Sequence, residues 1–487
     1  MKKVLLLILT AFMVGCGHNA EPSIQLNSEA DIAGKRIGYV SGTIYDLLLS
    51  PRTDISKYCF NAQTDAVQAL VKNQIDIAID DDCNIPKDEQ RRLGIRLALH
   101  GEQNFECAFA LRKDAEELCA QLSHFIDSLK ANGEMQQLYD RWFESDYPDQ
   151  NAMPDLGADP QGQPIIVCLA TNIPPVSFPV GDEWRGFEPE ILQRFAHAIG
   201  RPLVFINLPA SSAIASLQSR KSDILGGAIF ITEERQKTMR FTSSHFNAHP
   251  GYFVKDASIQ STARFGERMK STFYNNLIRE DRWRYITDGL WETVKISFFA
   301  ILLGALLGGG ICWMRMCRRK WLSVTAKVYI DLMRGIPMLV FLMIMFYVVL
   351  AKAGIGASTV AIIAFALNFA AYVSEMFRTA IESVGKGQTE AGLAIGFTPL
   401  QTFLHIVAPQ ALRNVMPVFK GEAISLVKNT SIVGYIAIQD LTRASDLIRN
   451  RTFDAFFPLL IVTIIYFILA WLLGKLLDLT VKTPSKK

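Results

Sequence analysis

Two charged side chains stand inside one apolar segment of the sequence, residues 412–438. They are Glu422 and Lys428. Three polar residues follow Lys428 directly: Asn429, Thr430 and Ser431. Because a charge in hydrocarbon costs at least about 2.5 kcal/mol, ionisable residues in a membrane helix are functional candidates. In one hypothesis this stretch lines a cavity through the membrane, where Lys428 meets a carboxylate and Glu422 a polar or cationic group. The alternative is a Glu422–Lys428 ion pair, or polar contacts between helices.

Other residues that could carry chemistry are explained by a structural role, and several catalytic motifs are absent from the sequence. Glu375 and Arg378 have the i, i+3 spacing at which opposite charges pair on a helix, so we expect a structural ion pair. The sequence contains no GxxxxGK[ST] phosphate loop and no CxxC or Cys/His cluster. We therefore expect no enzyme activity, no cofactor and no metal site. The net charge of +3 gives no reason to expect nucleic-acid binding.

Five apolar segments dominate the second half of the 487-residue chain. They cover residues 289–313, 325–351, 357–380, 412–438 and 456–479, and each is close to the roughly 20 residues that a spanning helix needs. The sequence thus predicts an all-α membrane domain of five transmembrane helices at 289–480. Basic residues at 315–320 and 482–487 indicate that the C-terminus is cytoplasmic, although three arginines fall in an outer loop.

The first residues are typical of a targeting segment. Lys2 and Lys3 precede an apolar stretch at 4–14 that is too short to span a bilayer. Gly15 and Cys16 end it and resemble a lipoprotein box, which would make residues 1–16 the signal peptide and Cys16 a lipidated N-terminus. An ordinary signal peptide is the alternative. In both cases the following domain is expected outside the cytoplasmic membrane.

The predicted cytoplasmic loop between the third and fourth spans is the most informative stretch. Residues 388–396 read QTEAGLAIG and residues 406–410 read IVAPQ, which predicts a short helix, a turn and a second short helix. The pattern resembles the EAA loop with which permeases of ABC importers dock on their ATPase. The resemblance places this contact at Glu390, Ala391, Gly392 and Gly396. Gly392 and Ala408 depart from the family's usual Ala and Leu.

Further motifs are similar to the polar amino-acid uptake branch of these permeases. They are MRGIP at 333–337, AYVSE at 371–375, QALR at 410–413 and KNTS at 428–431. The resemblance covers about 200 residues in the family's order. It implies an ATP-driven importer in the bacterial inner membrane, with a separate ATPase subunit that binds the ATP. It also implies a second permease subunit, most simply another copy of this chain.

The exported part resembles the periplasmic amino-acid-binding proteins, with its halves in reversed order. Strand and helix patterns alternate over 165–254, which favours an α/β sheet. GFEPEI at 186–191 and ITEER at 231–235 resemble the family's first half. GKRIG at 34–38, IDIAI at 75–79 and a closing helix at 133–143 resemble its second half.

We therefore expect a two-lobed α/β domain with circularly permuted lobes. Lobe 2 with its closing helix would cover residues 24–145, and a linker would follow at 146–163. Lobe 1 would cover residues 164–260, and residues 261–288 would lead into the membrane. Remnants of two separate domains are the alternative.

The resemblance also implies a substrate site between the lobes. Arg235 would grip a carboxylate, Asp81 would meet an ammonium group, and Ser41, Gly42 and Thr43 would donate hydrogen bonds. Asp80 and Asp82 flank Asp81 and leave the choice open. Four positions depart from the family: Ile173, Ala210, Ala228 and Phe230. The resemblance implies a polar amino acid as ligand: glutamine, glutamate or a basic amino acid. The departures weaken the expectation of ordinary amino-acid binding and leave a different ligand or a weak binding site open.

Two other classes of protein use such receptor folds. A ligand-gated channel or membrane sensor would need a selectivity filter or a signalling module, and the sequence shows neither. A receptor that only binds would have no use for the predicted docking loop.

Overall fold

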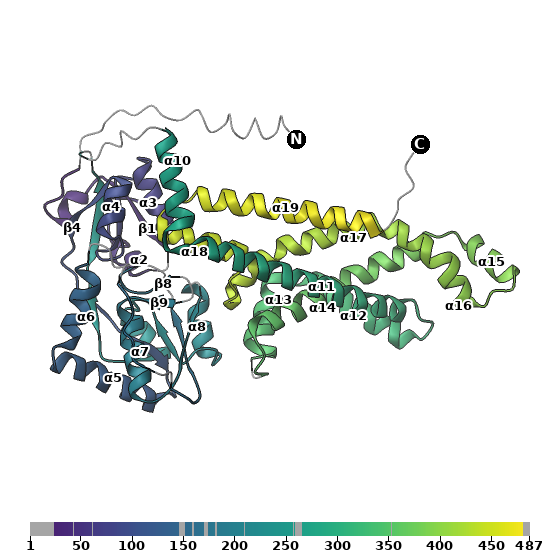
Figure 1. The fold of residues 1–487 in the computed structure, drawn as a ribbon, viewed down its shortest axis with the longest axis horizontal. Coiled ribbons are helices and arrows are strands. Elements are labelled where there is room, and N and C mark those ends of the chain that lie inside the picture. The colour runs from purple at the N-terminus through teal and green to yellow at the C-terminus, as the bar shows by residue number, and fades with distance from the viewer. Residues whose placement is uncertain are drawn as a thin grey trace. The chain divides into compact units, whose positions relative to one another are not determined.

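The computed structural model describes residues 24–41, 43–60, 62–145, 151–157, 160–169, 174–180, 183–208, 210–256, 258, 265–351 and 353–480 (Figure 1). The chain divides into two compact units. Unit 1 contains residues 1–104 and 249–265, and unit 2 contains residues 105–248 and 266–487. The division therefore runs through the α/β part of the chain and leaves residues 105–248 in the same unit as the apolar helices.

Unit 1 is built around a five-stranded sheet in the order β2-β1-β3-β14-β4. Its strands are β1 (Arg36–Val40), β2 (Ser56–Phe60), β3 (Ile77–Asp81), β4 (Ile95–His100) and β14 (Pro250–Lys255). The 3₁₀ turn η1 (Glu29–Ile32) precedes β1, and the strands are connected by α2 (Ile44–Leu49), α3 (Gln63–Val71) and α4 (Lys87–Leu93). β1 pairs in parallel with β2 and β3, whereas β14 is antiparallel to both of its neighbours. Continuous apolar runs in β1, β3 and β14 bury Ile37, Ile77 and Phe253, as expected for strands with both faces covered.

The α/β part of unit 2 has a second five-stranded sheet, in the order β10-β7-β11-β6-β12. Its strands are β6 (Ala110–Arg112), β7 (Ile165–Leu169), β10 (Leu203–Asn207), β11 (Ile224–Gly226) and β12 (Met239–Phe241). Two small sheets pair β5 (Phe105–Cys107) with β13 (Phe246–Ala248), and β8 (Phe178–Val180) with β9 (Glu183–Arg185). Its helices are α5 (Glu116–Ala131), α6 (Glu134–Phe143), α7 (Phe187–Ala198), α8 (Ala210–Gln218) and α9 (Glu233–Thr238).

The two large sheets share one strand order. In each sheet, four strands come from one continuous part of the chain. They lie in the order second, first, third and fourth, and one antiparallel strand is inserted between the third and the fourth. The inserted strand comes from a distant part of the sequence: β14 enters the sheet of unit 1, and β6 enters the sheet of unit 2. Consequently residues 105–145, expected together with 24–104, belong to the unit that holds 164–248.

A packed segment leads from the α/β part into the first long helix. It contains α10 (Phe265–Phe273), the π-turn η3 (Tyr274–Ile278) and the 3₁₀ turn η4 (Arg279–Asp281). The Glu280 carboxylate lies 2.8 Å from Arg282 and 2.6 Å from Arg451, and all three side chains are almost fully buried. Asn276, also buried, donates to Asp454 at 2.9 Å. The lead-in is therefore fixed to the helical region by buried polar contacts.

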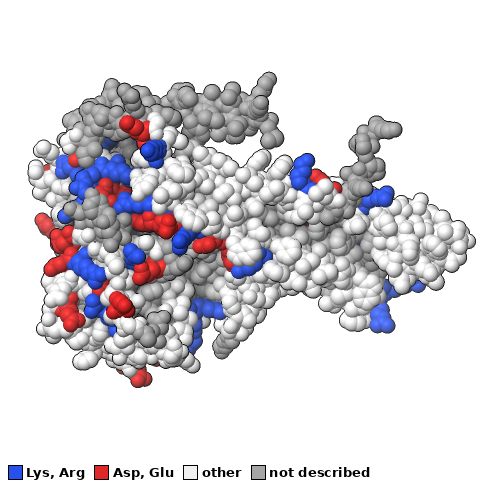
Figure 2. Space-filling view, viewed as in Figure 1, with Lys and Arg blue, Asp and Glu red and all other residues white. Residues whose placement is uncertain are grey.

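The helical region contains α11 (Trp283–Met316), α12 (Lys320–Gly335), α13 (Met338–Ile344), η5 (Met345–Val349), α14 (Ala357–Glu382), α17 (Ala408–Asn429), η7 (Thr430–Ile436), α18 (Leu441–Thr452) and α19 (Phe457–Thr480). Within the residues described, three helices are long and apolar enough to cross a membrane: α11, α14 and α19. A bent pair, α12 with α13 and η5, makes a fourth if it counts as one span. Figure 2 shows how sparse Lys, Arg, Asp and Glu are on the visible face of these helices.

The second predicted span, 325–351, is wrong as one straight helix. α12 and α13–η5 meet at an angle of 107°, and Pro337 stands at the break as the N-cap of α13. A proline disfavours helical backbone at the preceding residue, which ends α12 at Gly335. The fourth predicted span corresponds to α17 and η7. α17 is not among the three apolar helices, and it carries Arg413, Lys420, Glu422 and Lys428.

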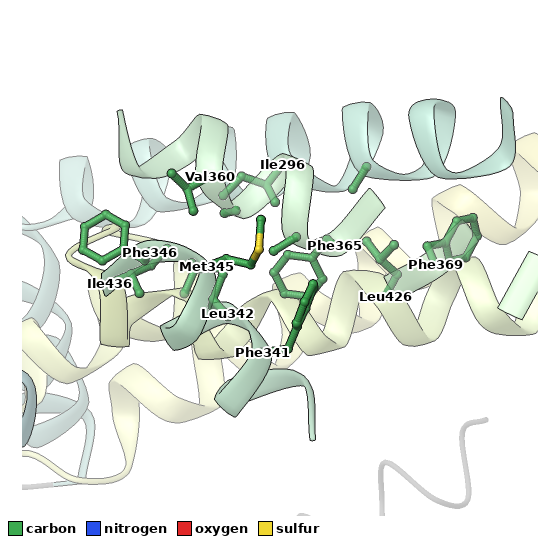
Figure 3. Packing of buried hydrophobic residues seen from close by; sticks show 14 of the residues in the cluster. Ile296, Phe341, Leu342, Met345, Phe346, Val360, Phe365, Phe369, Leu426 and Ile436 are labelled. Atoms are coloured by element: carbon green, nitrogen blue, oxygen red, sulfur yellow. The ribbon is translucent and has the colours of Figure 1, made fainter. Parts of the chain in front are cut away.

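One apolar core joins the long helices of this region. Ile296 of α11, Leu342 of α13, Val360 and Phe365 of α14, and Leu426 of α17 converge there, all 0–4% exposed (Figure 3). The core thus holds α17 against α14 and α13.

Candidate functional site

A cavity of about 820 Å³ opens between α12, α14 and α17. Four polar or charged side chains distinguish its lining: Arg334, Tyr372, Glu375 and Glu422. The remaining lining residues are Met376, Thr379, Ala380, Ser383, Asn414, Val415 and Val418. The lining therefore combines one guanidinium, two carboxylates and several hydroxyl or amide groups with an apolar wall, as in many small-molecule sites.

The charged side chains of the lining differ in how they are held. The Arg334 guanidinium lies over the Tyr372 ring, 5.4 Å from its centroid, a cation–π arrangement. Glu375 pairs with Arg378 at 2.7 Å, which confirms the predicted i, i+3 ion pair, and Arg315 lies 3.9 Å from the same carboxylate. Glu375 is thus neutralised by two arginines, while Arg334 and Glu422 are the opposite charges that this cavity offers to a ligand.

The residues predicted to line one passage differ in exposure and in whether they line this cavity. Glu422 lines the cavity, but Lys428 and Asn429 are exposed. Thr430 is buried and its hydroxyl donates to the Val427 carbonyl at 2.7 Å. Ser431 is half-buried. The cavity therefore brings Glu422 together with Arg334 and Tyr372, which belong to the MRGIP and AYVSE motifs and were not predicted as site residues.

The predicted docking loop has the expected form of a short helix, a turn and a second short helix. α15 (Lys386–Ala394) is followed by α16 (Pro399–Thr402) and the π-turn η6 (Phe403–Val407). Glu390 and Ala391 are exposed on α15. Ile395 and Leu400 are 70% and 66% exposed. α15 and α16 lie at one end of the helical region and α18 at the other (Figure 1).

Gly392 and Gly396 each have a steric role in this loop. A Cβ at Gly392 would lie 2.5 Å from the Thr402 Cγ2 and 2.9 Å from the Ile406 Cδ1, so the departure from the family's alanine lets α15 pack closely on the following turn. Gly396 has φ +91°, a left-handed conformation that favours glycine after a helix. The Phe397 N–H then donates to the Gly392 carbonyl at 3.1 Å and closes the turn.

In unit 1, Asp81 stands at the end of β3 and is buried, with 5% of its surface exposed. Its carboxylate accepts a hydrogen bond from the Tyr45 hydroxyl at 2.5 Å and another from the Asn84 amide at 3.2 Å. The Thr43 hydroxyl donates to the Val40 carbonyl at 2.6 Å, and the Ser41 N–H donates to the Phe60 carbonyl at 2.8 Å. Gly42 lies outside the described residues. Asp81 is thus already engaged by neutral donors of its own unit.

The contribution of Asp81 to the stability of unit 1 should fall as pH rises above 3.8. Burial, and next the charge of Asp80, raise the pKa of the Asp81 carboxyl above its ordinary value of 3.8. The folded unit therefore binds more protons than the unfolded chain, and this contribution to stability is complete below pH 3.8 and is lost as pH rises toward the raised pKa. Hydrogen exchange of the β3 amides, corrected for intrinsic rates at each pH, would measure the opening free energy.

The matched variant for this test is Asp81→Asn, which keeps the shape of the side chain and cannot ionise. It should show a smaller pH slope than the natural chain; Asp80, whose pKa burial also raises, should supply the remaining slope. An opening free energy that increases with pH in the natural chain would contradict the assignment of Asp81 as a carboxyl held neutral by burial.

In unit 2, Arg235 lies in the first turn of α9. Its guanidinium donates to the Phe230 carbonyl at 3.1 Å, and burial lowers the pKa of this side chain. The Phe230 ring is buried and lies 5.3 Å from the Phe105 ring. It therefore fills space where the family often has a threonine hydroxyl.

Ala228 shows why the family has glycine at its position. Its φ is +55°, in the left-handed region, and its N–H donates to the buried Glu188 carboxylate at 3.0 Å. Glu188 also accepts from the Gly227 N–H and lies 3.0 Å from His245. The buried carboxylate thus holds the 226–228 turn in place without glycine's freedom.

Several predicted positions are not placed by the structure or fall in different units. Cys16 and Ile173 lie outside the described residues, as does the side chain of Ala210. Arg235 and Phe230 belong to unit 2, whereas Asp81, Ser41 and Thr43 belong to unit 1. Within the residues described, no group of three or more His, Cys, Asp or Glu side chains could hold a metal ion.

Comparisons with known proteins address the helical region. Residues 300–482 match the family described as "Binding-protein-dependent transport system inner membrane component". The probable amino-acid ABC transporter permease protein YckA of Bacillus subtilis is 34% identical over 195 residues, 40% of this chain and 86% of that protein. The putative glutamine transport system permease protein GlnP of Rickettsia typhi is 33% identical over 194 residues, 39% of this chain and 88% of that protein.

Among solved structures, one described as "Crystal structure of an amino acid ABC transporter with histidines" is 34% identical. The match covers 45% of this chain and 98% of the chain in that structure, with a TM-score of 0.39. The residues matched by the family, 300–482, include the cavity and the α15–α16 loop.

Proposed function

The chain belongs to the family of inner membrane components of binding-protein-dependent transport systems and is the permease component of an amino-acid ABC importer, and we propose that it also carries the importer's receptor. The ATPase is a separate subunit. The receptor would be the two α/β sheets of residues 24–255. It would capture a polar amino acid and deliver it to the membrane cavity.

The observation that carries the receptor proposal is the common strand order of the two sheets. The two lobes have equal topology, and each is completed by a strand from a distant part of the chain. The chain therefore passes from one lobe to the other twice, at 104–105 and at 248–249. Two unrelated remnants would have no reason to exchange strands. The exchange therefore supports one circularly permuted domain, in which β7–β12 are the family's first lobe and β1–β4 its second.

The membrane cavity offers the charges that an amino acid needs. In this proposal the Arg334 guanidinium binds the substrate carboxylate and Glu422 binds its ammonium group, while Asn414, Ser383 and Thr379 are available to a polar side chain. Arg334 takes the role that the sequence had assigned to Lys428. We retain the prediction of five spans, with the bent α12–α13 pair and α17 among them.

The assembly follows from the same family membership. Two permease subunits, most simply two copies of this chain, would enclose the substrate path, and the exposed apolar side chains of α15 and α16 would dock on the ATPase. The receptor would lie outside the cytoplasmic membrane, anchored by a lipid on Cys16, with the C-terminus in the cytoplasm. Glutamine, glutamate and the basic amino acids are the proposed cargo.

The test is binding of the common amino acids to the purified full-length chain, by titration calorimetry. We expect saturable binding of one polar amino acid and at least about 30-fold weaker binding by Arg235→Ala, because removing one partner of a buried charge pair costs roughly 2–5 kcal/mol. Arg185→Ala is the matched control, since Arg185 pairs with Glu183 on the β8–β9 hairpin. Its affinity should be unchanged.

Two results would overturn parts of the proposal separately. A folded chain that binds none of the amino acids would remove the receptor and leave the permease. Amino-acid flux that needs neither the ATPase nor ATP would instead indicate a ligand-gated channel.

A further inference from the structure

We propose that residues 105–248 are a permanently docked part of the permease, seated in the same chain on the end of the helical region that carries α18. This inference rests on the proposed function only in treating these residues as half of a receptor. It goes beyond a tethered receptor, because a tether alone would leave the whole receptor free to leave its permease.

The first contact area lies between the β8–β9 hairpin and the helices α11 and α18. The Tyr285 hydroxyl of α11 donates to the Pro179 carbonyl at 2.9 Å. The Arg451 guanidinium of α18 lies 5.4 Å from the centroid of the Phe178 ring. Phe178, Tyr285 and Arg451 are all buried. Arg451 also pairs with Glu280 of the lead-in, so one buried cation joins the hairpin, α18 and the lead-in.

The second contact area lies along α8 and the carboxyl end of β10. The Lys221 ammonium, just beyond α8, lies 4.7 Å from the centroid of the Phe346 ring of η5. Arg443 of α18 donates to the Asn207 side chain at the end of β10. Ala437 packs against the apolar cluster that contains Leu208 and Ala213. This area therefore combines a cation over a ring, a hydrogen bond and apolar packing.

The two areas together explain why residues 105–248 belong to the same compact unit as the helical region. They involve different strands and helices of residues 105–248, so they fix its orientation as well as its position. The half-buried Lys221 has lost part of its hydration: burial lowers the pKa of its ammonium group, and a partly desolvated cation gains more from a ring than an exposed one. The lead-in between the two parts is itself packed through Glu280 and Asn276. A brief encounter would require neither a desolvated cation nor a fixed lead-in.

Cross-linking in the full-length chain tests the docking. In a chain whose Cys59, Cys83 and Cys317 are replaced by serine, the pair Asn207→Cys with Arg443→Cys would be treated with a short bismaleimide. The control pair is Val204→Cys with Arg443→Cys, because Val204 lies on the same strand but is 44% exposed and three residues away, on the opposite face. Single-cysteine variants show any reaction through the buried native cysteines.

A docked lobe should link the Asn207 pair at least about tenfold more than the Val204 pair, since fixed neighbours have a far higher effective concentration than groups that meet on a tether. The product should have the mass of one chain. Equal linking of both pairs would show a tethered lobe without docking. A product of two chains would show docking on the second copy and would overturn the same-chain assignment.

Hydrogen exchange gives a second measurement that needs no cysteines. Lys221→Glu would place a carboxylate on the negative face of the Phe346 ring, so exchange should increase in both 210–222 and 345–349. Lys221→Arg keeps the cation and should leave exchange unchanged. Unchanged exchange in both variants would overturn the contact. Amino-acid binding by the same variants separates this outcome from failure of the proposed function, because an undocked receptor still binds its ligand.

Discussion

Replacing Gly392 with leucine is expected to abolish ATP-driven uptake while the membrane helices remain folded. Gly392 is the position at which α15 touches the turn after α16, and even a Cβ there would lie 2.5 Å from the Thr402 Cγ2. Overpacking of this kind costs about 1–3 kcal/mol, and the strain can be relieved only by separating the two short helices. The exposed surface that α15 and α16 form together, which we propose docks on the ATPase, would then change its shape. The measurement is retention of the ATPase subunit on the purified permease, together with uptake of labelled amino acids.

The matched control for this prediction is Gly387→Leu in the same helix. Nothing lies within 4 Å of a Cβ built at Gly387, which is exposed. It should therefore keep both the ATPase and transport. If Gly392→Leu also kept them, close packing of α15 on the turn would be irrelevant to coupling, and the docking surface would have to be sought elsewhere on the chain.

The general course of the fold could be predicted because its patterns are local. β1, β3, β7 and β10 are short apolar runs between helical patterns, and α11, α14 and α19 are long apolar segments without internal charges in their central turns. The α15–α16 loop was predicted from small residues and glycine at the right spacing. In each case the sequence within one segment contains the information.

The strand exchange between the two sheets could not be read from single segments. β6 and β14 are as apolar as their neighbours, and nothing within them states which sheet they enter. Their partners lie more than a hundred residues away along the chain: β6 pairs with β11 and β14 pairs with β3. Only the non-local fold decides this pairing, which is why residues 105–145 were expected in the other lobe.

The sequence contains a signal for the bend between α12 and α13 that the predicted spans did not take into account. Gly335 and Pro337 stand in the middle of the predicted span 325–351 and are a recognised helix boundary. The prediction of the span depended on its length and apolar content, which these two residues hardly change. The same motif contains Arg334, which the bend leaves at the end of α12, where it lines the cavity. Thus the missed bend and the missed cavity residue have one cause.

The helical core should be most sensitive at Gly308 of α11. α11 packs along α14, and a Cβ at Gly308 would lie 2.9 Å from the Val373 Cβ and 3.0 Å from the Ala370 carbonyl oxygen. Gly304, one turn earlier, approaches the Ala366 carbonyl oxygen in the same way, at 2.9 Å. Small residues four apart permit such close contact between membrane helices. Gly308→Leu is therefore expected to lower the free energy of unfolding by about 1–3 kcal/mol or more, since the Val373 Cβ and the Ala370 carbonyl oxygen are fixed by the backbone of α14 and cannot move aside.

Thermal unfolding of the detergent-solubilised chain, followed by size-exclusion chromatography, measures this loss. Gly310→Leu is the control two residues further along the same helix, where a Cβ would meet nothing within 4 Å. Both changes add the same apolar side chain to α11, so hydrophobicity and helix propensity change equally. Only the distance to α14 differs between the two positions. A midpoint lowered at Gly308 alone would therefore measure the close packing of α11 on α14, whereas equal midpoints would show that the two helices can separate without cost to the fold.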